Sequence, residues 1–188
     1  PRECKVNRLE DGSGYCGTDA SMNIASICIH RGEEPPISGP DGICNIFFSG
    51  CNLRCVYCQN HDISQPEFSL PGKISDINEA LDKIESILAL GIEAIGFVSP
   101  SHVIPQVKAI IRGLQKRGLN PIRVYNTNGY DKAETIDSLD GLIDVWLPDY
   151  KYITPGLALK YSDADDYPEV VLKALKRMYY QVGSPLHI

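Results

Sequence analysis

The stretch ICNIFFSGCNLRCVYC, residues 43–58, joins a short apolar run to a tight group of cysteines. Its first part has the length and apolar character of a buried strand. Cys51, Cys55 and Cys58 follow at once, with three and then two residues between them. Thiolates prefer zinc, copper(I) or iron–sulfur clusters. The stretch therefore predicts a buried strand that leads directly into a metal-binding loop.

Three thiolates in one loop suit an open metal site better than a closed one. A structural zinc site is normally closed by four ligands. Three cysteines leave one iron of a cubane cluster uncapped, so that this iron can bind a further ligand. Zinc binding, or an incidental grouping of cysteines, is the alternative. Cys44 lies within the predicted strand and is expected to be a small core residue.

Outward from this stretch, apolar runs alternate with segments of helical periodicity. Further strands are predicted at 92–98, 122–125 and 142–147, and helices at 77–88, 103–114, 131–139 and 168–182. The strands are continuous apolar runs, which implies a parallel sheet covered by helices. We expect an α/β fold whose four βα units form either an open sheet or a partial, incomplete TIM-type barrel.

Residues 1–42 show no sustained period and are rich in glycine and proline. They are predicted to form an irregular, cysteine-containing N-terminal extension to a core domain at 43–188. Cys4 and Cys16 lie in this extension. They are expected either to bind a second metal or to pair, or to be spare thiols in a packed loop.

Polar residues follow each predicted strand. The loops are 51–60 after the first strand, 99–102 after the second, 126–129 after the third and 149–151 after the fourth. The carboxyl ends of parallel strands meet at one edge of a sheet, where ligands bind in such folds. All four loops are therefore expected to open on one face.

The composition excludes several classes of protein. The chain has 188 residues, a net charge of −6 and no Lys/Arg block, so a nucleic-acid partner is not expected. No apolar run approaches the ~20 residues that span a bilayer, and no signal peptide is visible. We therefore expect no membrane partner and a cytoplasmic location. Seven cysteines, an odd number, argue against a complete disulfide framework.

The segment 51–58 resembles the radical S-adenosylmethionine (SAM) signature, CxxxCxxC with an aromatic residue before the last cysteine. Its flanks resemble one uncharacterised subgroup, which is similar to pyruvate formate-lyase activating enzyme. Further matches to that subgroup run along the chain, at 6–8, 32–38, 47–50, 59–60, 125–130, 148–151 and 167–170.

The resemblance implies a [4Fe–4S] cluster on Cys51, Cys55 and Cys58, with SAM on the fourth iron. One electron then cleaves SAM to methionine and a 5′-deoxyadenosyl radical. The implied partners are a flavodoxin- or ferredoxin-like one-electron donor and a glycyl-radical enzyme or other protein substrate. Full family members continue beyond residue 188, so the core is expected to be truncated at its C-terminus. The alternative is a non-catalytic metal-binding module or an inactive fragment.

Roles for further residues follow from the same resemblance. Tyr57 is expected beside the adenine of SAM, with a loop aromatic that fills the mouth of the barrel as the alternative. Asn60 is expected in a hydrogen bond that shapes the cysteine loop, with a plain turn-forming residue as the alternative. The carbonyl groups near Ser99 are expected to accept from the SAM ammonium group. His102 is expected to contact a ligand, to handle a proton or to begin a helix.

The two remaining loops supply three more candidates. Asn126 stands where activating enzymes often have aspartate, which removes a negative charge and puts a cation site there in doubt. Asp149 and Lys151 are two apart on an extended segment and so point to the same side. Lys151 is expected to face the SAM carboxylate and Asp149 an amine or a ribose hydroxyl. A surface ion pair is the alternative.

Overall fold

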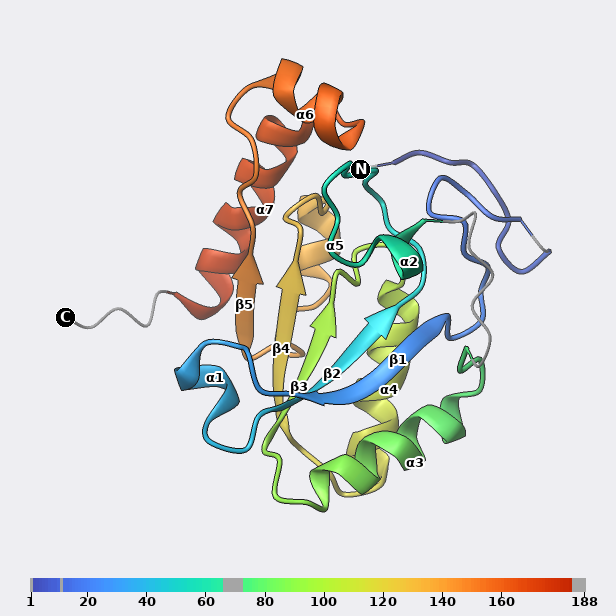
Figure 1. The fold of residues 1–188 in the computed structure, drawn as a ribbon, viewed down its shortest axis with the longest axis vertical. Helices are drawn as coiled ribbons and strands as arrows, with labels where there is room; N and C mark the ends of the chain where they lie inside the picture. Colours follow the sequence, from blue (N-terminus) through green and yellow to red (C-terminus); the bar gives the residue numbers. More distant parts are fainter. Residues whose placement is uncertain (1, 11, 66–72, 184–188) are drawn as a thin grey trace.

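A five-stranded sheet forms the centre of the computed structural model, which describes residues 2–10, 12–65 and 73–183. The strand order follows the sequence: β1 (Ile24–His30), β2 (Ile43–Phe48), β3 (Ala94–Val98), β4 (Ile122–Thr127) and β5 (Val145–Pro148). Strands β2 to β5 are parallel, and β1 is antiparallel to β2. The prediction of four parallel strands in an α/β fold is confirmed (Figure 1).

Strand β1 corrects the prediction that residues 1–42 are irregular throughout. Its pairing with β2 shifts register between Ile24 and Ser26, which interrupts the alternation of buried and exposed side chains. Ile24 and Ile27 are buried, whereas Cys28 is exposed on the free side of this edge strand. A short edge strand with a bulge leaves no regular period in the sequence, so it was missed.

Seven helices accompany the strands in the described residues. They are α1 (Pro35–Ser38), α2 (His61–Ser64), α3 (Ile77–Leu88), α4 (Ile104–Lys116), α5 (Ala133–Asp137), α6 (Pro155–Ser162) and α7 (Tyr167–Val182). Helix α6 was not predicted. It buries Ala158 and Ser162 but exposes Leu157 and Leu159, so its sequence has no apolar face to detect. No helix among the described residues is long and apolar enough to cross a membrane.

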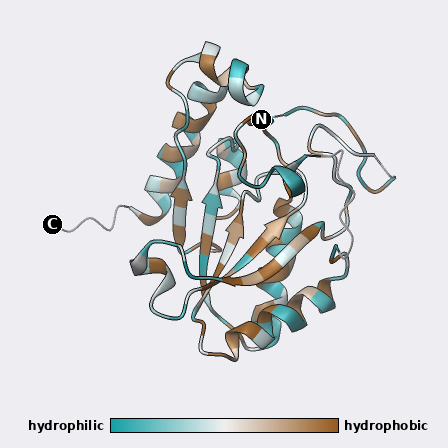
Figure 2. Cartoon of the chain, viewed as in Figure 1, coloured by the Kyte–Doolittle hydropathy of each residue, from teal (hydrophilic) through white to brown (hydrophobic). Residues whose placement is uncertain are grey.

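The main core lies between the sheet and helices α3, α4, α5 and α7. Apolar residues predominate in β1, β3 and β5, whereas β4 also carries hydrophilic residues, and the two kinds alternate along the helices (Figure 2). Alternate strand residues such as Ile95 and Phe97 point into this core together with Ile84 and Ile110. The residues between them form a smaller cluster on the opposite face, centred on Ile43, Ala94 and Val124, with Ile37 of α1. The larger helices thus cover one face of the sheet.

One predicted helix start is confirmed and another is wrong. The Asp76 carboxylate caps α3 by accepting from the backbone N–H groups of Asn78 and Glu79, at 2.8 and 3.1 Å. Asp131, which has the spacing of a capping box with Glu134, was expected to open the helix predicted at 131–139, but α5 begins at Ala133. The Asp131 side chain is instead buried, and its carboxylate accepts hydrogen bonds from hydroxyl groups of β4.

The carboxylate of Asp131 accepts from two hydroxyl groups of β4. These are the phenol of Tyr125, at 3.0 Å, and the hydroxyl of Thr127, at 2.6 Å. Burial raises the pKa of Asp131 in spite of these bonds. The hydrogen bonds with Tyr125 and Thr127 therefore replace the helix cap that the local sequence motif predicts for Asp131.

His102 joins the loop after β3 to the end of β2. It is buried, and its Nε2 lies 2.9 Å from the carbonyl oxygen of Ser49, to which the neutral ring donates. Its own carbonyl accepts from Arg8 at 2.6 Å, which ties down the N-terminal segment. Burial lowers the pKa of His102 to about 4, and the nearby Arg8 charge acts in the same direction.

This burial predicts a pH-dependent stability. Because the folded-state pKa lies below the ordinary value of 6.5, the unfolded state binds more protons between pH 6.5 and 4. Stability is therefore lost as pH falls through that window, by about 2 kcal/mol at pH 5. Replacement His102→Gln keeps an N–H donor and does not titrate.

Urea unfolding at pH 5 and pH 7.5 measures this effect as the difference between wild type and His102→Gln. The difference removes the contribution of Asp131, whose raised pKa acts in the opposite direction in both proteins. We expect the variant to lose about 2 kcal/mol less than wild type on acidification. Equal losses in the two proteins would mean that His102 is not held neutral.

Candidate functional site

The three clustered cysteines lie in the loop that follows β2, at the carboxyl edge of the sheet. Cys51 is buried, and Cys55 and Cys58 are half-buried. Burial raises the pKa of Cys51 to about 11 and also raises that of Cys55. These thiols hold their protons at neutral pH in the absence of a metal, so a metal that binds here must displace them.

Each of the three sulfur atoms lies beside a hydrogen-bond partner. Cys51 Sγ accepts from the backbone N–H of Leu53 at 3.4 Å and from the Asn128 amide at 3.6 Å. Ser162 donates to Cys55 Sγ at 2.9 Å. The Ser64 hydroxyl is 3.4 Å from Cys58 Sγ.

These partners come from four separate parts of the chain, namely the loop itself, α2, the loop after β4 and the end of α6. A thiolate removed from water needs such donors. The surroundings of all three sulfur atoms therefore suit bound thiolates.

Helix α6 holds the cysteine loop in place through its last turn. The backbone N–H of Arg54 donates to the carbonyl of Ser162 at 3.2 Å, and that of Val56 donates to Tyr161 at 2.9 Å. The last turn of a helix leaves carbonyl groups without intrahelical partners. Here those carbonyl groups bind the N–H groups on either side of Cys55.

A closed set of amide hydrogen bonds joins the cysteine loop to the loop after β4. Asn52 donates to the carbonyl of Tyr130 at 2.6 Å, and the backbone N–H of Tyr130 donates to the side chain of Asn128 at 2.9 Å. Asn128 in turn donates to the side chain of Asn52 at 2.8 Å.

Both asparagines are buried, and both were missed as site residues. The sequence feature that could have identified them as site residues is their position inside two of the predicted strand-end loops. The expectation that these two loops meet is confirmed.

The loop after β4 also packs closely against the start of the loop after β5. Gly129 has a φ of +78°, and a side chain there would lie 2.4 Å from the carbonyl oxygen of Asp149. Glycine is required at this approach of two backbones. The phenol of Tyr167 donates to the carbonyl of Asn128 at 2.8 Å and accepts from the N–H of Lys151 at 3.0 Å. Helix α7 thus supports both loops from beneath.

The remaining predicted residues lie along the same edge. The exposed Asn60 precedes α2, and its carbonyl, not its side chain, accepts from Ile63 and Ser64. Ser99 has a φ of +48° and donates its N–H to the carbonyl of Asn126 at 2.8 Å. Asn126 is half-buried at the end of β4.

Tyr57, Asp149 and Lys151 complete the predicted set. The ring of Tyr57 is half-exposed, and its hydroxyl bonds with that of Tyr152. The Lys151 ammonium group is 2.6 Å from the Asp149 carboxylate, which is the ion pair named as the alternative. The charge of Lys151 opposes the rise that burial causes in the pKa of Cys55, so this pair lies beside the cysteine loop.

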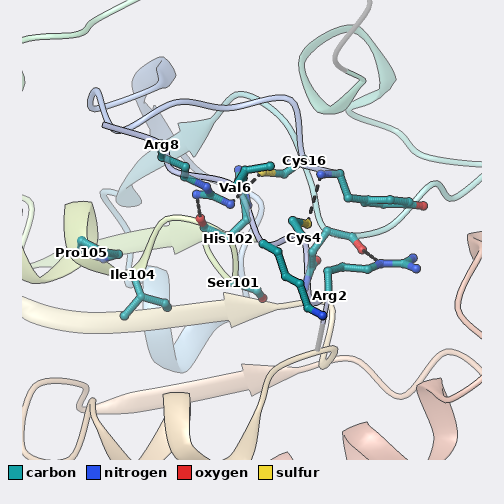
Figure 3. Close-up of a pocket in the computed structure, with 12 residues that line it drawn as sticks. Arg2, Cys4, Val6, Arg8, Cys16, Ser101, His102, Ile104 and Pro105 are labelled. Carbon is teal, nitrogen blue, oxygen red and sulfur yellow. Dashed lines mark hydrogen bonds between the residues drawn. The ribbon is translucent and has the colours of Figure 1, made fainter. Parts of the chain in front are cut away.

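A cavity of about 260 Å³ lies between the N-terminal segment, the loop after β3 and Asn52 of the cysteine loop (Figure 3). Cys4 and Cys16 line it, together with His102. The sulfur of Cys16 accepts from the Arg8 guanidinium at 3.0 Å, and that of Cys4 from the N–H of Tyr15 at 3.3 Å. These are the contacts of thiols in a packed loop, and a second metal site on Cys4 and Cys16 stays a prediction.

Within the part of the chain that the structure describes, no three His, Cys, Asp or Glu side chains converge on a point that could hold one metal ion. Ligands of a single zinc ion must all lie about 2.3 Å from one centre when they are sulfur atoms. Thiolates on different irons of a cubane share no such centre. The described residues therefore show no preformed site for a single metal ion, and a cluster on Cys51, Cys55 and Cys58 stays a prediction.

Comparison with known proteins gives two similar curated relatives. The chain is 30% identical over 171 residues to an uncharacterised protein of Methanocaldococcus jannaschii, which covers 89% of this chain and 49% of that protein. It is 28% identical over 183 residues to a 7-carboxy-7-deazaguanine synthase of Methanopyrus kandleri, with 86% and 67% covered. The chain thus spans about half the length of the first relative and two thirds of the second.

A family model described as the Radical SAM superfamily matches residues 45–179. Neither relative is named as an activating enzyme, so the comparisons support the superfamily and not the narrower subgroup. The matched range contains the whole cysteine loop and all of the parallel sheet except the start of β2. The chain belongs to the radical SAM superfamily.

Proposed function

We propose that this chain is the cofactor-binding part of an enzyme that reductively cleaves SAM. Cys51, Cys55 and Cys58 hold a [4Fe–4S] cluster, which supplies the electron that converts SAM to methionine and a 5′-deoxyadenosyl radical. The observation that carries this proposal is the hydrogen-bonding environment of the three sulfur atoms, in a loop that lies within the family match.

The residues near the cysteine loop suit the charges of SAM. Lys151 lies close enough to Cys55 for its charge to oppose the rise in the pKa of that thiol, so its ammonium group can bind the SAM carboxylate in exchange for Asp149. The half-exposed ring of Tyr57 offers a surface for the adenine. Ser99 and Asn126 present backbone and amide groups at the same edge of the sheet.

The sheet itself is proposed to be part of an incomplete barrel. Helices α3, α4, α5 and α7 share one core on one face, as the outer helices of a barrel do. Among the described residues, the opposite face carries the small cluster around Ile43 and the short helix α1. In a barrel this face would point inward, and Asn126 would line the mouth beside the cysteine loop.

The electron for SAM cleavage must come from a partner, for which we propose a flavodoxin- or ferredoxin-like protein. Val56 is 73% exposed and lies between two of the cysteines. An exposed apolar residue next to a redox centre is a natural contact for a small donor protein, because weak electron-transfer interfaces are small and bury few residues.

The substrate of the proposed enzyme is a more specific question than its cofactor chemistry. Activation of a glycyl-radical enzyme was expected from the sequence and stays a prediction, because neither relative carries that name. The carboxyl edge of the sheet is where any substrate must approach the deoxyadenosyl group.

The first test of this function removes one ligand of the cluster. We expect Cys55→Ala to lower both cluster content and SAM cleavage by at least about tenfold, because two thiolates cannot hold the cubane. Iron and sulfide analysis after anaerobic reconstitution, and chromatography of 5′-deoxyadenosine under reduction, measure the two effects.

Cys28→Ala is the matched control, since Cys28 is exposed on β1 and lies outside the loop. It is expected to keep full cluster content and activity. If Cys55→Ala kept the full iron and sulfide content and the full rate of SAM cleavage, the proposal would be wrong. Stoichiometric zinc without iron in the wild-type protein would favour a non-catalytic binding module.

The second test concerns the electron donor. We expect Val56→Glu to slow reduction by a flavodoxin or ferredoxin severalfold, because a charge is placed in an apolar contact. Reduction by dithionite, which needs no docking surface, should be unchanged. Leu90→Glu is the control, because Leu90 is 69% exposed but lies at the opposite edge of the sheet, before β3. Equal rates for the two variants would exclude Val56 from the donor contact.

A further inference from the structure

Three hydroxyl groups form a continuous hydrogen-bonded chain from the surface to the sulfur atom of Cys55. We propose that this chain, Tyr57 to Tyr152 to Ser162, donates to the Cys55 thiolate and raises the reduction potential of the bound cluster. The inference rests on the proposed function, since it requires that Cys55 ligates iron. It assigns a role to Tyr152 and Ser162, which neither the signature nor the strand-end loops single out.

The contacts of this chain are short and mostly buried. Ser162 Oγ is 2.9 Å from Cys55 Sγ and 2.7 Å from the hydroxyl of Tyr152. The Tyr152 hydroxyl in turn bonds with that of Tyr57. Ser162 is fully buried and Tyr152 is 8% exposed, whereas Tyr57 is 51% exposed. The hydrogen-bonded chain therefore runs from the solvent-exposed Tyr57, through two buried residues, to the sulfur atom of Cys55.

The number of hydrogen atoms fixes the direction of the chain. A hydroxyl group has one hydrogen to donate, and a metal-bound thiolate can only accept. Ser162 must therefore give its hydrogen to Cys55 and accept from Tyr152. Tyr152 must then accept from Tyr57, whose hydroxyl is the first donor. Each hydroxyl group therefore donates to the next group along the chain toward the sulfur atom.

This orientation favours the reduced state of the cluster. Reduction adds one negative charge, and part of that charge lies on the ligating sulfur atoms. A donor that points at a sulfur stabilises the more negative state more strongly, which raises the reduction potential. Hydrogen bonds in series polarise one another, and a dry site strengthens each of them. Tyr152 should thus strengthen the bond that Ser162 makes.

Ser162 should have the largest effect among the side-chain donors at the three sulfur atoms. Its 2.9 Å contact is shorter than that of Ser64 with Cys58, at 3.4 Å, and that of Asn128 with Cys51, at 3.6 Å. Its backbone is also fixed, because its carbonyl accepts from Arg54 in the cysteine loop. The donor and the sulfur therefore move together.

The experiment is a redox titration of the reconstituted protein, followed by absorbance and by the electron paramagnetic resonance of the reduced cluster. We expect Ser162→Ala to lower the equilibrium constant for one-electron reduction about tenfold, which is a shift of about 59 mV to more negative potential. Tyr152→Phe keeps the last donor but removes its polarising partner. It should shift the potential in the same direction by less.

Controls separate this effect from a general loss of structure. Ser86→Ala removes an exposed hydroxyl of α3 that bonds only to the carbonyl of Lys83, and it should leave the potential unchanged. Thermal unfolding of each variant reports its stability. A packing role for Ser162 would lower the melting temperature without moving the potential, which is the reverse of the expected pattern.

The outcomes distinguish failure of the inference from failure of the proposed function. A wild-type protein that takes up no iron and sulfide overturns the function, and the inference falls with it. A loaded wild type with unchanged potentials in Ser162→Ala and Tyr152→Phe overturns the inference alone. If Ser162→Ala does not fold, the sign of the shift in Tyr152→Phe decides, and a shift of zero or to more positive potential refutes the proposed chain.

Discussion

Removal of the Cys51 and Cys55 sulfur atoms from water is the constraint on which the rest of the site depends. Burial raises the pKa of both thiols, so the charged form that binds iron is disfavoured unless something compensates it. Hydrogen-bond donors supply part of that compensation at every sulfur. A metal bound here, as we propose, would supply the remainder by displacing the protons. The residues of the cysteine loop do not supply all of these donors, so other parts of the chain must contribute some of them.

The parallel sheet solves this problem by bringing distant loops to one edge. Asn128, from the loop after β4, closes a set of amide bonds with Asn52 and approaches the Cys51 sulfur. The end of α6 binds the backbone on either side of Cys55 and places Ser162 against its sulfur. The supporting residues are therefore a consequence of topology, because parallel strands end at the same edge of a sheet.

Several features were predictable from the sequence because they depend on local periodicity. The four parallel strands are continuous apolar runs, and Asp76 caps α3 through atoms two and three residues away. Features that depend on distant partners were not predictable. β1 exists because β2 offers a partner, and α6 packs with small residues that leave no apolar stripe. Asp131 matches a capping motif, but its carboxylate accepts hydrogen bonds from Tyr125 and Thr127 and does not cap α5.

The sequence by itself determined the set of ligands on which the proposed chemistry rests, because ligand type and spacing are local properties. Cys51, Cys55 and Cys58 are close in the chain whatever the fold, and three thiolates in one loop leave an open position on a cluster. Only the tertiary structure decided which groups surround those thiolates. Ser162 lies 107 residues from Cys55 in the sequence, and Asn128 lies 77 residues from Cys51. Their hydrogen bonds arise from the packing of α6 and of the loop after β4, and no local pattern encodes a contact at such a separation.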